Sequence, residues 1–122
     1  MPVPQPPRLT VATSFGARLK GLMFTAALAQ DEALLMTRCA SVHTCFMRYA
    51  LDVVYLDAEW RITRLVPSLR PWRMSLGGAR AANALEMSAG SIERLGWRAG
   101  EDLRAYVGRY LRGVHRSPTV AS

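Results

Sequence analysis

The most restrictive feature of the sequence is the run DVVYLD at residues 52–57. Its β-branched and aromatic residues favour an extended strand. The residues AEW at 58–60 are enough only for a turn, and the segment RITRLVP at 61–67 then predicts the returning strand of a hairpin. The centre of the chain is therefore committed to a β-sheet.

Further strands are predicted on either side of this hairpin, at residues 8–13, 33–38 and 83–88. A helix is expected over residues 15–24, with Ser14 as its N-cap, and a second short helix over residues 89–96, capped by Ser88 and closed by Gly96. Most connections are too short for helical crossovers, which disfavours a doubly wound sheet. The predicted fold class is α+β: a mainly antiparallel β-sheet or partial barrel with two short helices.

The length of 122 residues is that of one domain, and the 50% hydrophobic content is that of a globular chain. Residues 1–7 hold four prolines and are expected to form an extended tail. Residues 8–106 are predicted to form the globular domain, and residues 107–122 a basic C-terminal tail.

The net charge of +7 comes from the second half of the chain, where residues 61–122 carry eleven arginines and four acidic residues. Such a bias fits an accessory protein that contacts nucleic acid or an anionic surface, and it equally fits arginines on a solvated face. Because no nucleic-acid-binding motif accompanies the charge, nucleic acid is an unlikely partner. Five of these arginines lie in a stretch of the sequence that contains no acidic residue, namely Arg61, Arg64, Arg70, Arg73 and Arg80.

Several features favour a cytoplasmic location. No stretch approaches the roughly 20 apolar residues that cross a bilayer, and the N-terminus lacks a basic segment followed by an apolar run. Cys39 and Cys45 would lie roughly 20 Å apart in one straight strand, too far for a disulfide unless a hairpin joins them. Two free thiols are expected, as in a reducing compartment.

The stretch SVHTCFMRY at residues 41–49 raises the question of a reactive site. In a strand, His43 and Cys45 would share one face, next to each other. They could then hold a soft metal or form a base and nucleophile, which makes an enzyme or metal protein centred on them the alternative function. Too few further ligands accompany them for a closed metal site, and no third group orients a nucleophile. No catalytic residue, metal or cofactor is therefore assigned.

The carboxylates do not form an acid–base pair. Asp52 and Asp57 point to opposite faces of one strand, and Asp57 suits the start of a turn. Glu86 lies in an apolar strand, so it is either exposed on a wet face or, if both faces are covered, paired with an arginine. In the buried case it could also anchor a polar ligand.

The preferred hypothesis is a non-catalytic domain that binds a small polar or anionic ligand or a protein partner. The segment LRPWR at residues 69–73 places an indole between two arginines, which could clamp an anion or an aromatic group. The favoured interpretation is that the indole of Trp72 tucks against the edge of the core while the arginines stay in water. The ligand-binding residues predicted around the short loop before the central strand are His43, Thr44, Arg48, Asp52, Arg70 and Trp72.

Four segments follow one another in a fixed order: RLKGLMF, DEALLM, CFMRYALDVVYLDAEWRITRLV and ALEMSAGSIERLGWRAGED. In this order they resemble the small bacterial and archaeal family catalogued as domain of unknown function 192. The likeness covers about residues 8–103 and implies a compact, β-rich α+β domain without an established reaction. The helix motif is Arg18, Gly21, Leu22 and Met23; the central motif is Met47, Leu51, Asp52, Leu56 and Asp57; the closing motif is Leu85, Glu86, Ala89, Gly90, Glu93, Arg94, Leu95, Gly96 and Gly100.

The chain departs from this family in three places. The loop between Met47 and Asp52 is short, and residues 104–122 have no counterpart. The hairpin turn, where the family often has Asp-Gly, carries Glu59-Trp60.

Overall fold

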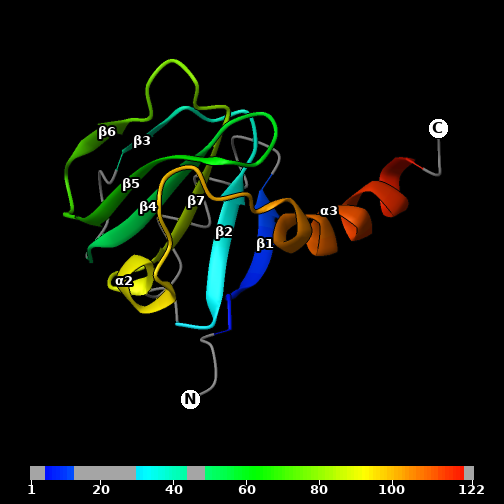
Figure 1. The fold of residues 1–122 in the computed structure, drawn as a ribbon, viewed down its shortest axis with the longest axis horizontal. Coiled ribbons are helices and arrows are strands. Elements are labelled where there is room, and N and C mark those ends of the chain that lie inside the picture. The colour runs from blue at the N-terminus through cyan, green and yellow to red at the C-terminus, as the bar shows by residue number, and fades with distance from the viewer. Residues whose placement is uncertain (1–4, 13–29, 44–48, 120–122) are drawn as a thin grey trace.

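The computed structural model describes residues 5–12, 30–43 and 49–119 (Figure 1). Its elements, in chain order, are β1 (Arg8–Ala12), β2 (Glu32–Met36), β3 (Ser41–His43), β4 (Leu51–Leu56), β5 (Ile62–Leu69), β6 (Met74–Leu76), β7 (Asn83–Ser88), α2 (Ser91–Leu95) and α3 (Arg104–Thr119). The helix expected at residues 15–24 lies outside the described residues.

The strands form an open five-stranded sheet in the order β1-β2-β7-β4-β5, together with a two-stranded ribbon of β3 and β6. All pairs are antiparallel except β1 with β2, which run parallel. The predicted α+β class is confirmed, and the described strands form an open sheet, not a closed barrel. The parallel pair is possible because residues 13–31 separate its strands, and parallel neighbours need a long connection.

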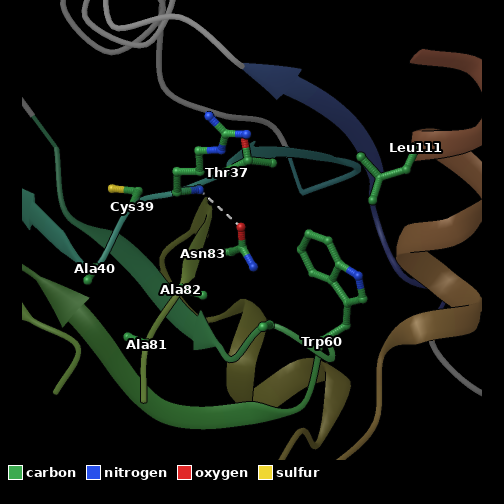
Figure 2. A pocket seen from close by; sticks show the side chains of 10 residues that line it. Thr37, Cys39, Ala40, Trp60, Ala81, Ala82, Asn83 and Leu111 are labelled. Atoms are coloured by element: carbon green, nitrogen blue, oxygen red, sulfur yellow. Dashed lines mark hydrogen bonds between the residues drawn. The ribbon is translucent and has the colours of Figure 1, made fainter. Parts of the chain in front are cut away.

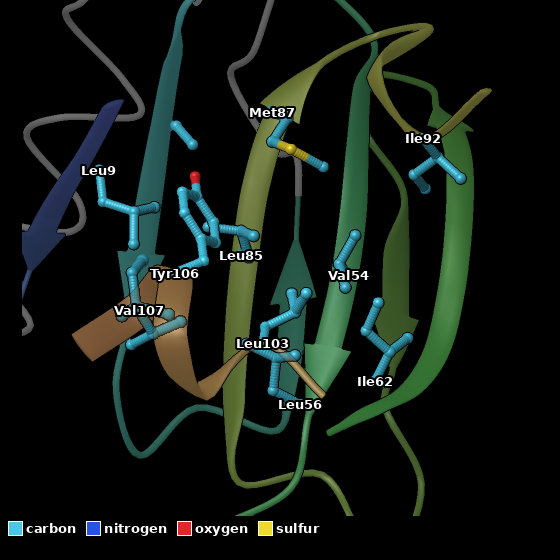
Figure 3. Packing of buried hydrophobic residues seen from close by; sticks show 12 residues of the cluster. Leu9, Val54, Leu56, Ile62, Leu85, Met87, Ile92, Leu103, Tyr106 and Val107 are labelled. Carbon is cyan, nitrogen blue, oxygen red and sulfur yellow. The ribbon is translucent and has the colours of Figure 1, made fainter. Parts of the chain in front are cut away.

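One face of the main sheet packs against α2 and the first turns of α3 (Figure 3). Leu85 and Met87, at alternate positions of β7, point to this side and are fully buried. Tyr106 and Val107 of α3 and Leu103, which directly precedes that helix, belong to the same cluster. This cluster is the larger of two hydrophobic cores.

Tyr106 ties the C-terminal helix to the start of the chain. Its hydroxyl donates to the backbone carbonyl of Pro7 at 2.6 Å. Its ring lies 5.8 Å from that of Trp97 and 5.9 Å from that of Tyr110. Burial raises the pKa of the Tyr106 phenol well above its usual range, so the group stays a hydrogen-bond donor.

The opposite face of the sheet forms the second core, next to the β3–β6 ribbon. Val42 of β3 belongs to this core, and Ser75 of β6 is buried. The fully buried Tyr55 donates its hydroxyl to the backbone carbonyl of Ser75 at 2.9 Å. Every residue of β4 is therefore buried, because both faces of that strand are covered.

The predicted strands at residues 8–13, 33–38, 52–57, 61–67 and 83–88 correspond to β1, β2, β4, β5 and β7. Strand β6 is not among the predicted strands, and its three residues form one because they pair with β3. Helix α3 runs across the expected start of the tail at residue 107 and continues to Thr119.

The second predicted helix is α2. Its C-terminal end is as predicted, whereas its N-cap is a different residue from the one expected. Gly96 closes it in the left-handed conformation, with φ of 69°. Its N-cap is Gly90, whereas the expected cap, Ser88, shares a hydrogen bond of 3.0 Å with Ser91. Within the described part of the chain, no helix combines the length and apolarity needed to cross a bilayer.

Candidate functional site

Connections that are distant in sequence meet at one end of the main sheet. The β2–β3 connection is joined to the β6–β7 connection by the amide of Cys39, which donates to the carbonyl of Ala82 at 2.8 Å. The amide of Ala82 in turn donates to the carbonyl of Leu56, at the end of β4, also at 2.8 Å. Backbone hydrogen bonds therefore hold these segments in a fixed arrangement beside the β4–β5 turn.

An open pocket of about 690 Å³ lies between these segments and α3 (Figure 2). This volume is within the range of small-molecule sites. The described residues that line it are mainly small and apolar, with an indole and a few polar groups: Thr37, Arg38, Cys39, Ala40, Ala58, Trp60, Ala81, Ala82, Asn83 and Leu111.

Trp60 forms one wall of the pocket and has an unusual backbone. Its φ is 68°, a left-handed conformation that costs a residue with a Cβ about 1–2 kcal/mol. The turn holds it there: its amide donates to the carbonyl of Asp57 at 3.1 Å, and its carbonyl accepts the amide of Leu103 at 2.9 Å. Glycine is the residue that this backbone conformation favours, so tryptophan is present despite the conformational cost of its Cβ.

Asp57 stabilises the same turn through its side chain. Its Oδ1 accepts the amides of Glu59 and Arg61, each at 2.9 Å. The expectation that Asp57 shapes the hairpin turn is thus confirmed, since a carboxylate at the start of a turn commonly accepts from amides within it.

Asn83 forms the floor of the pocket and joins two of its walls. The side chain is buried; its Oδ1 accepts the amide of Arg38 at 3.1 Å, and its Nδ2 donates to the carbonyl of Asp57 at 3.3 Å. Because these bonds engage both ends of the amide, Asn83 mainly fixes the pocket's shape. Arg38, whose φ of 54° is also left-handed, is held in the β2–β3 connection by this contact.

Cys39 contributes a thiol to the pocket. It is a free cysteine, half-buried, and its Sγ donates to the carbonyl of Ser41 at 2.9 Å. Neither a histidine nor a carboxylate is among the described lining residues, so none of these can serve as a base for the thiol. Cys45, and with it the proposed His43–Cys45 pair, lies outside the described side chains.

None of the residues predicted from sequence to bind a ligand is among the described residues that line this pocket. The backbone of His43 pairs with Met74, which places it near Arg70 and Trp72 in the exposed β5–β6 connection. Thr44 and Arg48 lie outside the described residues. Asp52 is fully buried, with both carboxylate oxygens bonded to backbone amides, and so lies in the interior and not on the predicted surface.

Glu86 is a buried carboxyl group in the centre of the main sheet. It is fully buried on the second-core face of β7, directly between Leu34 of β2 and Val53 of β4 in the sheet register. Neither of its oxygens has a hydrogen-bond partner in the described structure. Burial raises its pKa from 4.5 to about 8, so the side chain is mostly neutral at pH 7. The arginine partner expected for a buried Glu86 is not found among the described residues.

Glu86 also acts on its neighbours. The pKa of Tyr49 is raised mainly by burial, and to a smaller extent by the negative charge of Glu86 when that residue is ionised.

Among the described residues, no group of three or more His, Cys, Asp or Glu side chains is placed to hold a metal ion.

The sequence did not reveal that four of the residues lining the pocket come together, namely Arg38, Cys39, Trp60 and Asn83. The available signal was Glu59-Trp60 in a turn where Asp-Gly is common, because a large residue in a glycine position requires a reason. Nothing local in the sequence links residues 37–40 to residues 81–83.

Known proteins share both the sequence pattern and the fold. Residues 3–105 match a model of the family DUF192, described as uncharacterized ACR. A UPF0127 protein of Pyrococcus horikoshii is 34% identical over 97 residues, which cover 77% of this chain and 84% of that protein.

Two solved structures are similar in fold. A protein of unknown function from Novosphingobium aromaticivorans superposes with a TM-score of 0.71 at 22% identity, over 79% of this chain and 73% of that one. A protein from Sinorhizobium meliloti, described as a candidate transcription regulator, gives a TM-score of 0.69 at 23% identity, over 77% and 78% of the two chains.

Proposed function

The chain belongs to the uncharacterised DUF192 family, and we propose that its role is to bind a small ligand that has a flat apolar body and an anionic group. The ligand occupies the pocket between the β2–β3 connection, the β4–β5 turn and α3. The observation that carries the proposal is Trp60, a large aromatic residue held in a left-handed turn at the pocket wall.

The apolar part of the ligand is argued from the pocket lining. Trp60 offers an aromatic surface, and Ala58, Ala81 and Leu111 line the same pocket. Flat apolar groups gain from stacking on such a surface beyond the area that they bury. The left-handed strain at Trp60 is consistent with a functional role, because strained residues concentrate at binding sites.

The anionic part is argued from charge. Arg38 is the charged residue among the described lining side chains, and no described carboxylate lines the pocket with it. A guanidinium binds a carboxylate through two parallel N–H donors, which gives both affinity and orientation. The pocket is therefore complementary to a small aromatic or alicyclic carboxylate.

The test is an NMR titration of the full-length protein with phenylacetate and with its uncharged amide, phenylacetamide. We expect phenylacetate to shift the backbone amides of Thr37–Ala40 and Ala81–Asn83. Arg38→Gln should reduce its affinity to that of phenylacetamide. Trp60→Gly should weaken both compounds, because it removes the aromatic wall and leaves a residue that the backbone favours.

Arg98→Gln is the matched control, since Arg98 is an exposed arginine that does not line the pocket. If Arg98→Gln weakens phenylacetate as much as Arg38→Gln does, the charge effect is nonspecific and the proposal is wrong. It is also wrong if a panel of aromatic and alicyclic carboxylates leaves the pocket amides unshifted.

A further inference from the structure

A second surface lies apart from this pocket, on the outer side of β6. Trp72, Met74 and Leu76 are 58%, 71% and 60% exposed, and they are the exposed large hydrophobic residues of the described structure. They occupy alternate positions over five residues. Isolated exposed apolar residues are common, whereas three adjacent ones indicate a contact surface.

The strand geometry explains why the side chains of Met74 and Leu76 face outward. Ser75, between Met74 and Leu76, is buried and accepts the hydroxyl of Tyr55. Since successive side chains of a strand point to opposite faces, Met74 and Leu76 must project away from the sheet. Their exposure shows that they extend from the surface into solvent.

The stretch of chain that carries these side chains is strongly basic. Arg64, Arg70, Arg73 and Arg80 are exposed, and residues 60–85 contain no aspartate or glutamate. Arg64 is held beside β6, because its Nη1 donates to the carbonyl of Leu76 at 2.6 Å. Projecting apolar side chains and excess positive charge therefore occur together.

We propose that this surface, formed by Trp72, Met74, Leu76 and the surrounding arginines, binds the face of an anionic lipid bilayer. A bilayer interface accepts projecting apolar side chains without a matching cavity, and indoles favour that interface. The arginines are attracted to anionic headgroups, and their apolar stems remain in contact with the lipid.

Two other partners fit less well. A nucleic acid would use the arginines, but the aliphatic Met74 and Leu76 offer neither hydrogen bonds nor rings to bases. An acidic protein would need its own groove to receive side chains that protrude this far. Both partners are included as outcomes of the test.

The experiment is flotation of the full-length protein with phosphatidylcholine vesicles, with and without phosphatidylglycerol. We expect binding only to the anionic vesicles, with loss as salt is raised. The variant Met74→Ser/Leu76→Ser should bind about tenfold more weakly because it lacks the inserted side chains. Both positions are exposed, and an unchanged urea unfolding curve will show that the fold is intact.

Arg70→Gln/Arg73→Gln should also weaken binding, whereas Arg98→Gln, which lies outside this surface, should change it little. No flotation with anionic vesicles at low salt overturns the proposal, as does full binding by Met74→Ser/Leu76→Ser. It is likewise overturned if duplex DNA or poly-glutamate binds more tightly than the anionic vesicles, since a different partner would then be favoured.

Discussion

The carboxylate of Asp52, on β4, accepts the backbone amide of Ile92, in the first turn of α2, at 2.8 Å through Oδ2. Its Oδ1 accepts the amide of Ser68 at 2.8 Å, at the point where the β4–β5 register shifts. The N-cap of α2, Gly90, has no side chain for this purpose, so Asp52 supplies the acceptor from another element. One buried side chain therefore joins a central strand, a bulge and a helix.

Asp52→Ala should lower the free energy of unfolding by about 3 kcal/mol, because two buried amides lose their acceptor. Urea unfolding followed by circular dichroism measures this change. Asp31→Asn is the control: that carboxylate is exposed in its pair with Arg8, and its loss should cost less than about 1 kcal/mol. Equal losses for the two variants would contradict a structural role for Asp52.

Glu86 should make stability fall as pH rises. Its pKa is raised from 4.5 to about 8 in the folded protein, so between these values the folded state holds a proton that the unfolded state has released. The free energy of unfolding should thus decrease by up to about 1.4 kcal/mol per pH unit in this window.

Glu86→Gln removes the titrating group and should flatten this dependence while increasing stability at pH 8. Urea unfolding across the pH range measures both. If the variant and the natural protein show the same slope, Glu86 has a partner that keeps it ionised. Glu93→Gln, an exposed carboxylate on α2, is the matched control and should leave the slope unchanged.

Gly77 should not tolerate a side chain. A Cβ added there would lie 2.5 Å from Cδ1 of Tyr55 and 2.5 Å from Cβ of Ala81. Gly77→Ala is therefore expected to cost about 1–3 kcal/mol of stability in thermal or urea unfolding. The double variant Gly77→Ala/Ala81→Gly should recover part of this loss, and no recovery would show that the clash with Tyr55 dominates.

Trp60 allows the backbone cost of the turn to be measured separately from the indole. Trp60→Gly and Trp60→Ala both remove the ring, but only alanine keeps a Cβ at a φ of 68°. The glycine variant should be more stable than the alanine variant by about 1 kcal/mol in urea unfolding. In an ordinary strand or helix the order is reversed, so an alanine variant of equal or higher stability would mean that the turn is unstrained.

Much of the fold could be predicted from local patterns. The runs that became β1, β2, β4, β5 and β7 are recognisable because short apolar or β-branched runs bounded by turn residues act over a few positions. Strand β6 was missed because three residues carry no pattern, and only their pairing with β3 makes them a strand. Most of α3 was missed because residues 107–122 were expected to be a basic tail, and a basic composition does not by itself exclude a helix.

The candidate site was harder to predict because its residues come from separate parts of the chain. Arg38 and Asn83 are far apart in sequence, yet one hydrogen bond of 3.1 Å joins them. A pattern search over neighbouring residues cannot find such a pair, since the sheet order β2-β7-β4 brings their connections together. The favoured interpretation that the Trp72 indole tucks against the core is also wrong, since the side chain is 58% exposed, and whether an indole is covered depends on contacts with distant segments.

The sequence by itself determined an α+β chain with a central hairpin, an excess of arginine in its second half and a large residue in a turn that favours glycine. The tertiary structure decided what the polar residues do. Asp52 is a structural acceptor, and Glu86 is a buried, mostly neutral acid, because both faces of their strands are covered. Covering a strand depends on contacts between distant segments, and the residues of that strand alone cannot specify it.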